Sequence, residues 1–133
     1  MDVTDRVLVD TNVASWIGAG RSRYKEWADA LRGRRAFVSF ITVGEIIRGG
    51  VRAGWSEAKL GEWERRLQAY TVIPGTIWVA RAYGRIGARF YRQIGDNDLW
   101  IVATALAYDL PIATADEGLT AVAEAFGVQV VAS

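Results

Sequence analysis

The chain has 133 residues and a formal net charge of +1, and it contains no cysteine and no histidine. These absences exclude disulfides, thiolate nucleophiles, histidine acid–base pairs, and metal sites built on imidazole or thiolate. Any chemistry must therefore use carboxylates, hydroxyls, amines, guanidinium groups or oxygen-bound metal. The length is typical of one domain, so we expect a single domain over residues 1–133. No stretch approaches the ~20 apolar residues that span a bilayer, and the start does not resemble a signal peptide, so we expect a cytoplasmic protein with no membrane partner.

Charge is distributed unevenly along the chain. Residues 21–92 carry 15 basic and 6 acidic residues, whereas residues 93–133 carry 6 acidic residues and no Lys or Arg. Fourteen of the 16 basic residues are Arg, which favours bidentate recognition of phosphate or carboxylate. Solvated helix faces would give the same composition, so charge alone leaves both interpretations open.

Short apolar runs alternate with helical patterns along the whole chain, with no repeat or low-complexity segment between them. This alternation predicts an α/β fold, a three-layer α/β/α domain with a central, mainly parallel five-stranded sheet. In chain order we expect strand 6–9, helix 13–17, helix 22–31, strand 36–39, a helix opened by Thr42 and closed by Gly49 and Gly50, helix 57–70, strand 71–74, helix 76–93, a helix capped by Asp96 or Asn97, strand 111–114, a helix from Asp116 to about 126, and strand 128–131.

The expected helix over 76–93 is amphipathic. Apolar residues recur on one face at spacings of three and four, and arginines occupy the opposite face. An arginine row of this kind is an RNA-backbone contact or a plain solvated face, and the sequence leaves both open. The four arginines are Arg81, Arg85, Arg89 and Arg92.

Four carboxylates are expected at one edge of the sheet. Asp10 directly follows the first strand, and Asp116 follows the strand that ends at Thr114. Ligands of such sheets bind outside the carboxyl ends of the strands. Glu45 and Asp98 lie in the first turns of helices that begin at this edge if they run antiparallel to the strands. The four side chains can therefore converge on one spot.

Such a cluster needs protons, arginines or a cation, because like charges ~4 Å apart repel by about 4 kcal/mol at an effective dielectric of 20. Ligation by oxygen alone selects Mg²⁺ or Mn²⁺, and Ca²⁺ less well. Each carboxylate also has an ordinary interpretation, as a loop aspartate, a first-turn glutamate or a helix cap. Only their joint position favours a metal site.

Four segments carry these acidic residues. They are Val9-Asp10-Thr11-Asn12, Thr42 to Gly49, Asn97 to Leu106, and Ala113 to Asp116. In this order they resemble the four acidic motifs of PIN-domain ribonucleases, and most closely those of the toxin half of VapBC-type toxin–antitoxin pairs. The resemblance runs from Arg6 to Val131, and the segment from Asn97 to Leu106 is its most specific part.

The resemblance implies a Mg²⁺- or Mn²⁺-dependent endoribonuclease that cuts structured RNA such as tRNA or rRNA, is neutralised by a cognate antitoxin and forms a homodimer. By motif alignment, Asp10, Glu45 and Asp98 are the metal-holding catalytic residues. Asp116 completes the set, although Glu117-Gly118-Leu119 after it departs from the family pattern of a further acidic residue and an aromatic. Asn12 and Thr114 are implied as polar support, and Asp96 falls outside the aligned position.

Hydrolysis of the phosphodiester by metal-activated water is consistent with this resemblance and needs no histidine. It leaves a 5′ phosphate and a 3′ hydroxyl. The alternative is a catalytically silent PIN-fold module that binds RNA or protein. A phosphate-accepting regulatory domain fits less well, because it needs a late lysine and no lysine follows Lys59. A haloacid-type phosphatase also fits less well, because it needs Asp-x-Asp where this chain has Asp10-Thr11-Asn12. Trp16, Trp55 and Trp63 are either core residues or part of a groove for a dimer partner or antitoxin.

Overall fold

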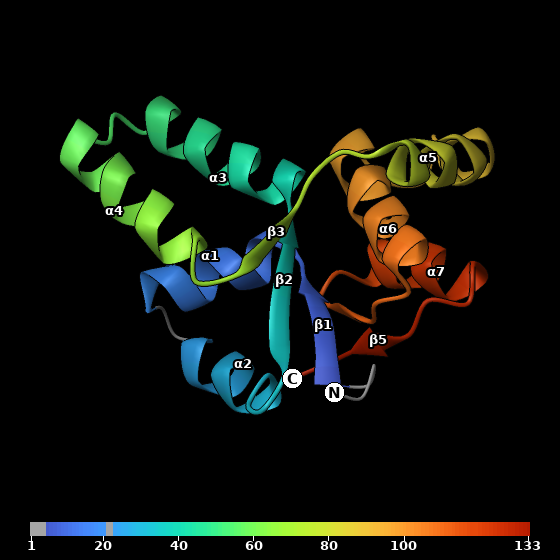
Figure 1. The fold of residues 1–133 in the computed structure, drawn as a ribbon, viewed down its shortest axis with the longest axis horizontal. Coiled ribbons are helices and arrows are strands. Elements are labelled where there is room, and N and C mark those ends of the chain that lie inside the picture. Colours follow the sequence, from blue (N-terminus) through green and yellow to red (C-terminus); the bar gives the residue numbers. More distant parts are fainter. Residues whose placement is uncertain (1–4, 21–22) are drawn as a thin grey trace.

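The computed structural model describes residues 5–20 and 23–133, which form five strands and seven helices. Strands and helices alternate in three layers, as the sequence predicts (Figure 1). None of the described helices is long and apolar enough to cross a membrane. In chain order the elements are β1 (Arg6–Val9), α1 (Thr11–Ala19), α2 (Tyr24–Ala30), β2 (Arg35–Ser39), α3 (Phe40–Arg52), α4 (Glu57–Leu67), β3 (Thr71–Ile73), α5 (Ile77–Phe90), α6 (Asp96–Tyr108), β4 (Ile112–Ala113), α7 (Glu117–Ala125) and β5 (Val130–Val131).

The strands form one sheet in the order β3-β2-β1-β4-β5, and every neighbouring pair is parallel. The expected five-stranded sheet is confirmed, and it is parallel throughout. Strand β1 lies at its centre, where Leu8 is in register with Phe37 of β2 and Ile112 of β4. The carboxyl ends of these central strands therefore meet at a single edge.

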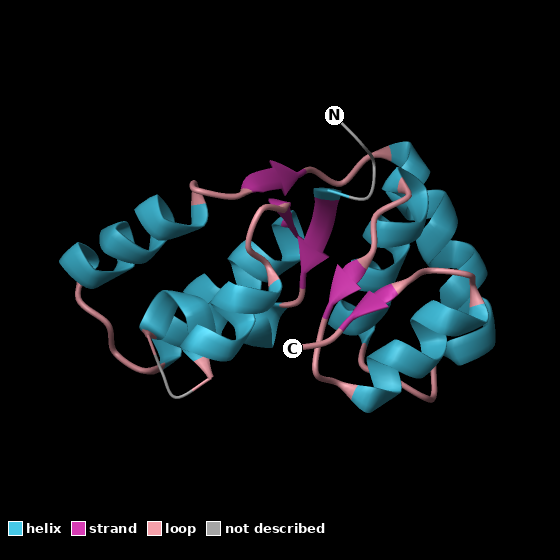
Figure 2. Ribbon diagram, turned by 90° about the horizontal axis from the view of Figure 1, so that it is seen from below, coloured by secondary structure: helices cyan, strands magenta, loops and turns pink. Residues whose placement is uncertain are grey.

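Alternate residues of β1 enter two different cores, because successive side chains of a strand point to opposite faces. Val7 and Val9 are fully buried with α1 to α4, including Trp27 of α2. Leu8 is fully buried with α5, α6 and α7. Seen from below, the sheet lies between these two helical layers (Figure 2).

Helix α3 corrects one expected boundary. It begins at Phe40 rather than Thr42, because the Ser39 hydroxyl caps it by accepting a hydrogen bond from the Ile41 amide at 3.1 Å. Nor do Gly49 and Gly50 end it. Gly50 is buried inside the helix, and a Cβ there would lie 2.1 Å from a ring carbon of Trp55, so this glycine serves close packing rather than termination.

Helix α6 corrects a second boundary. Its N-cap is Gly95, and Asp96 is already the first helical residue, so neither Asp96 nor Asn97 caps it. The Asp96 carboxylate instead accepts a hydrogen bond from the Tyr83 hydroxyl of α5. Helices α4 and α5 end at Leu67 and Phe90, a few residues before the expected 70 and 93. The expected start of the second helix at Ser22 lies outside the described residues.

Candidate functional site

The carboxyl ends of β1 and β4 carry the first two functional side chains. Asp10 follows β1 directly, and its amide donates to the Ala113 carbonyl of β4 at 3.0 Å. Thr114 directly follows β4, and Asp116 is the N-cap of α7. Parallel pairing of β1 with β4 thus brings residues about a hundred positions apart in the sequence to one edge.

Asp10 is buried, with only 3% of its surface exposed. Burial is the main cause that raises its pKa; hydrogen bonds from the Thr114 side chain and the Thr11 backbone lower the pKa, and the charges of Asp116 and Glu45 raise it. A buried carboxylate with a raised pKa is costly to keep ionised unless positive charge is supplied.

Thr114 links Asp10 to Asp116. Its hydroxyl donates to Asp10 Oδ2 at 2.7 Å and accepts from the Asp116 amide at 3.0 Å. Asp116 in turn caps α7, with Oδ1 accepting from the Leu119 amide at 2.9 Å. Asp116 is therefore both a helix cap and a member of the carboxylate cluster, and Thr114 orients the first carboxylate against the second.

A second chain of hydroxyl groups holds Glu45. Thr11 donates to Glu45 Oε1 at 2.7 Å, and its oxygen lies 2.9 Å from the Thr42 hydroxyl. Because Thr11 has a single proton, given to Glu45, Thr42 is the donor to Thr11. Thr42 is fully buried one turn before Glu45 on α3. Sequence reasoning did not identify either threonine as a positioning residue.

Asp98 enters from the first turn of α6 and is half-buried. Its pKa is raised to about 6, first by burial and then by the charges of Asp10, Asp116 and Glu45. No cation figures among these causes. The negative charges of Asp10, Glu45 and Asp116 thus act on Asp98, although the four carboxylates come from the ends of β1 and β4 and from α3 and α6.

The donor chemistry of this cluster fits a hard divalent cation. All candidate ligands are carboxylate oxygens, which Mg²⁺ and Mn²⁺ prefer, and their mutual repulsion is the energy that a cation would relieve. The ion pairs found among the described residues lie elsewhere, between Arg23 and Glu26, Arg32 and Asp29, and Arg66 and Glu62. As the side chains stand, no group of three or more acidic residues in the described part of the chain is arranged to hold a metal ion.

Asn12 is exposed, and among the described residues no side-chain hydrogen bond joins it to the carboxylates; the hydroxyl that reaches Glu45 is that of Thr11. Asp96, which falls outside the aligned motif position, accepts a hydrogen bond from the Tyr83 hydroxyl.

The predicted arginine row is only partly helical. Arg81, Arg85 and Arg89 are exposed on α5, whereas Arg92 lies beyond the end of the helix at Phe90, with its guanidinium 5.2 Å from the ring of Tyr91.

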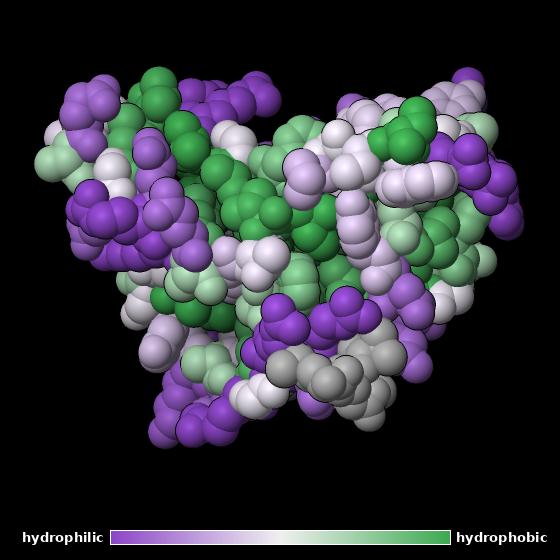
Figure 3. Space-filling view, in the orientation of Figure 1, coloured by the Kyte–Doolittle hydropathy of each residue, from purple (hydrophilic) through white to green (hydrophobic). Residues whose placement is uncertain are grey.

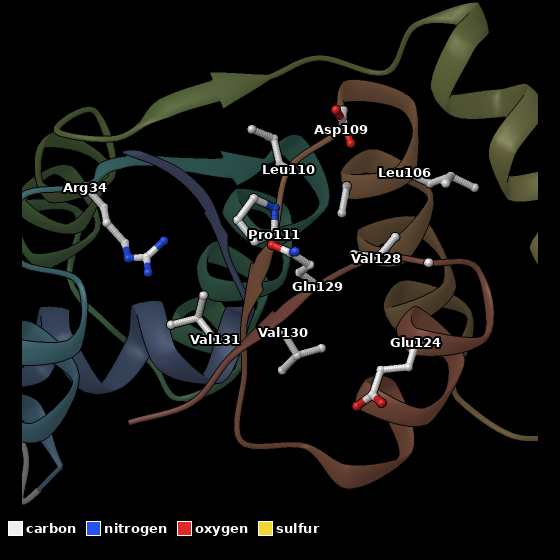
Figure 4. Close-up of a pocket in the computed structure, with 12 residues that line it drawn as sticks. Arg34, Leu106, Asp109, Leu110, Pro111, Glu124, Val128, Gln129, Val130 and Val131 are labelled. Carbon is white, nitrogen blue, oxygen red and sulfur yellow. The ribbon is translucent and has the colours of Figure 1, made fainter. Parts of the chain in front are cut away.

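Two of the hollows in the described part of the structure bear on the sheet and the carboxylates. A cavity of about 970 Å³ lies where the chain enters β4 and β5, at Pro111 and Gln129, the edge opposite to Asp10 (Figure 4). A groove of about 310 Å³ adjoins the carboxylates between α1, α3 and the start of α4. Its lining includes Glu45 and the three tryptophans Trp16, Trp55 and Trp63.

The three tryptophans differ in their exposure. Trp63 is buried in the core, and Trp55 stacks on it at 5.3 Å between ring centroids while remaining partly exposed. Trp16 is partly exposed beneath the Arg23 guanidinium, 4.6 Å from the ring centroid.

A wholly parallel sheet with four acidic side chains at its carboxyl edge is the arrangement of a PIN fold, and the family model of the PIN domain matches residues 7–125. The chain therefore belongs to the PIN-domain family. A curated relative, "Ribonuclease VapC" of Rickettsia bellii, is 30% identical over an alignment of 115 residues that covers 81% of this chain and 83% of the relative.

Two solved structures show the same fold at low sequence identity. VapBC2 from Rickettsia felis, bound to a DNA fragment from its promoter, has a TM-score of 0.78 and 17% identity over 96% of this chain and 98% of that one. VapBC-5 from Mycobacterium tuberculosis, a member of the VapBC family of toxin–antitoxin systems, has a TM-score of 0.69 and 24% identity over 97% and 99%.

Proposed function

We propose that the chain is a metal-dependent endoribonuclease of the VapC type. The observation that carries the proposal is the cluster of Asp10, Glu45, Asp98 and Asp116, in which burial and then the three neighbouring charges raise the pKa of Asp98 to about 6. An uncompensated cluster of this kind is characteristic of functional sites. The ribonuclease name of the curated relative supports the same activity.

In this proposal Asp10, Glu45 and Asp98 hold Mg²⁺ or Mn²⁺, and Asp116 completes the set. When bound, such an ion supplies acidification of water and neutralisation of charge on the phosphodiester. The protein's own hydroxyl groups orient the ligands: Thr114 fixes one oxygen of Asp10, and Thr11 fixes one oxygen of Glu45. The remaining lone pairs of these carboxylates would be available to an ion. Hydrolysis by water leaves a 5′ phosphate and a 3′ hydroxyl.

The substrate that we propose is structured RNA, such as tRNA or rRNA. Arg81, Arg85 and Arg89 give α5 an exposed basic face that fits a phosphate backbone. Arg92 extends this face beyond the helix end. A site that is negative at its centre needs such a basic surface beside it to attract a polyanion.

The partners that we propose are a cognate antitoxin and a second copy of the chain. The groove beside Glu45, with its partly exposed Trp16 and Trp55, suits a protein segment, because aromatic residues are enriched at the centres of interfaces. The toxin–antitoxin systems to which the solved relatives belong support this partner. We propose the cytoplasm as the location, since tRNA and ribosomes are there.

The alternative is a catalytically silent module that binds RNA or protein. Cleavage of 3′-end-labelled total RNA distinguishes the two, because the labelled fragments carry the newly formed 5′ end. Purified protein is incubated with RNA in Mg²⁺ or Mn²⁺, with and without EDTA, beside the variant Asp10→Asn. Asp109→Asn, at the far end of α6, is the matched control.

The nuclease proposal expects discrete fragments with 5′ phosphates from the wild type and from Asp109→Asn, and none with EDTA or Asp10→Asn. Retained RNA binding without any cleavage would establish the silent module. Cleavage that survives both EDTA and Asp10→Asn would remove the carboxylates from the reaction.

A further inference from the structure

A further, smaller hollow lies between α5 and the start of α6. Its volume is about 210 Å³, below the ~300–1,000 Å³ of drug-sized ligand sites, so it suits a single flat ring system. Asp96 on its wall precedes Asp98 by two residues, so the hollow and the carboxylate cluster lie on opposite sides of one helical turn, roughly 10 Å apart. The lining includes Tyr83, Gly84, Gly87, Tyr91 and Asp96.

Two glycines inside α5 keep this hollow open. Glycine in a helix interior is less stable than alanine, so its presence there calls for a packing or functional reason. An added Cβ at Gly84 would meet no neighbouring atom within 4 Å, and one at Gly87 would meet only Leu99, at 3.9 Å. Close packing therefore explains neither glycine, in contrast to Gly50. A side chain at either position would instead take up room in the hollow.

The aromatic and charged groups around the hollow match the flat face and the phosphate of a nucleotide. Tyr91 is 61% exposed, and the Arg92 guanidinium lies 5.2 Å from its ring centroid, so the pair offers a stacking surface beside a positive charge. Tyr83 is held in place by stacking on Trp100, with 3.8 Å between the ring centroids. In the space-filling view the surface over α5 is mostly pale, neither strongly hydrophobic nor strongly hydrophilic, and hydrophilic residues border it on the right (Figure 3).

The Asp96 carboxylate distinguishes the RNA bases by their hydrogen-bonding edges. An ionised carboxylate only accepts hydrogen bonds, at about four lone-pair sites, and the Tyr83 hydroxyl uses one of them. Guanine presents two adjacent donors, N1–H and the N2 amino group, on its Watson–Crick edge. Adenine, cytosine and uracil place an acceptor beside their single donor group. A carboxylate therefore pairs with guanine through two hydrogen bonds and faces an unpaired acceptor with any other base.

We propose that this hollow binds a guanine base of the RNA substrate. Tyr91 stacks on the base, Asp96 accepts from its Watson–Crick edge, and Arg92 contacts its phosphate. The distance of roughly 10 Å to the carboxylate cluster corresponds to about three nucleotides at the 3.4 Å spacing of a stacked strand. A guanine bound here would thus fix which phosphodiester reaches the cluster. The inference rests on the proposed function for RNA as the ligand, and the choice of base follows from the hollow.

Fluorescence anisotropy of the full chain with labelled RNA hexamers tests the proposal. The probes are UUGUUU and its three counterparts with A, C or U at the third position. Binding is measured in EDTA, so that metal-dependent cleavage does not occur. The repulsion between RNA and the metal-free carboxylates is the same for all four probes and cancels from the ratio of their affinities.

Three variants separate the roles of the side chains. Asp96→Ala removes the group that distinguishes the bases, Tyr91→Ala removes the stacking ring, and Gly84→Leu fills the hollow with a better helix former. Gly61→Leu in α4 is the matched control, because a Cβ there meets only the flexible Arg65 side chain, at 3.5 Å. Circular dichroism melts check that each variant folds.

The wild type and Gly61→Leu should bind UUGUUU about tenfold more tightly than the other three probes, as expected of one bidentate contact. Asp96→Ala and Gly84→Leu should bind all four alike, and Tyr91→Ala should bind UUGUUU about tenfold more weakly than the wild type does.

Equal binding of the four probes by the wild type would overturn the proposal, and so would a guanine preference that survives in Asp96→Ala. Free 5′-GMP that displaces the labelled probe as well as unlabelled UUGUUU does would overturn the assignment to an RNA strand. Cleavage is not read in this experiment, so a failure of the nuclease proposal would appear only in the assay with total RNA.

Discussion

The Asp98 carboxylate should destabilise the metal-free fold at neutral pH. Its pKa rises from 3.8 to about 6 on folding, so the folded state prefers the neutral acid. The stability that this group contributes is fully present below about pH 4 and is lost as the pH rises through 6. Replacing Asp98 by Asn keeps the shape and removes the charge, so Asp98→Asn should be more stable than the wild type at pH 7.5 in EDTA.

The magnitude follows from linkage. A rise of about 2 pK units corresponds to about 3 kcal/mol. Asp98 is only half-buried, and solvent screens part of the repulsion from its neighbours, so we expect about 1.5 kcal/mol. For a chain of this length, that gain raises the melting temperature by about 5 °C.

Urea unfolding between pH 4 and 8 in EDTA measures this difference. The advantage of Asp98→Asn should be near zero at pH 4, grow through pH 6 and level off above pH 7. Asp96→Asn is the matched control, because Asp96 lies in the same first turn of α6 but faces Tyr83. It should show no such pH-dependent gain. An Asp98→Asn variant that is equal to or weaker than the wild type at pH 7.5 would refute the reasoning.

Three further changes have defined outcomes. Thr114→Val leaves two buried polar partners without a hydrogen bond, so urea unfolding should show a loss of about 1–3 kcal/mol together with slower RNA cleavage; unchanged stability would contradict the hydroxyl link. Gly50→Ala, whose Cβ meets a tryptophan ring, should lower the melting temperature, whereas Gly49→Ala, with open space around it, should hold or raise it; equal effects would argue against the close packing. Replacing Arg85 and Arg89 by Gln should reduce the slope of log RNA affinity against log salt by about 2 in filter binding, and an unchanged slope would make α5 a plain solvated face.

The architecture could be predicted from the sequence because a parallel sheet buries both faces of its strands. Runs such as Val7-Leu8-Val9 are then apolar throughout, and the helices between them keep a helical period. The alternation of strands and helices also predicted that the carboxylates lie at the carboxyl edge of the sheet. Asp10 and Asp116 come directly after strands, so their place needed no knowledge of side-chain contacts.

The details that the sequence did not reveal depend on tertiary contacts. Threonine is a common residue at helix starts, so the sequence predicted that Thr42 opens this helix. In the structure Thr42 lies inside α3, and its hydroxyl is hydrogen-bonded to the Thr11 hydroxyl. Asn12 was expected as a supporting residue, and only the packing of α1 against α3 shows that the neighbouring Thr11 reaches Glu45. Gly50 was predicted to end the helix because glycine is common after helix C-termini. Its packing against the ring of Trp55, a residue beyond the helix end, could not be foreseen from the sequence.

The central claim is that carboxylates from separate elements together hold a divalent cation, and Mn²⁺ titration calorimetry at pH 7.5 tests it most directly. The wild type and Asp96→Asn should bind Mn²⁺ alike, and Asp98→Asn should bind at least about tenfold more weakly. If the wild type binds no Mn²⁺, or if Asp98→Asn binds it as well as the wild type does, the cluster is not a metal site and the account is wrong.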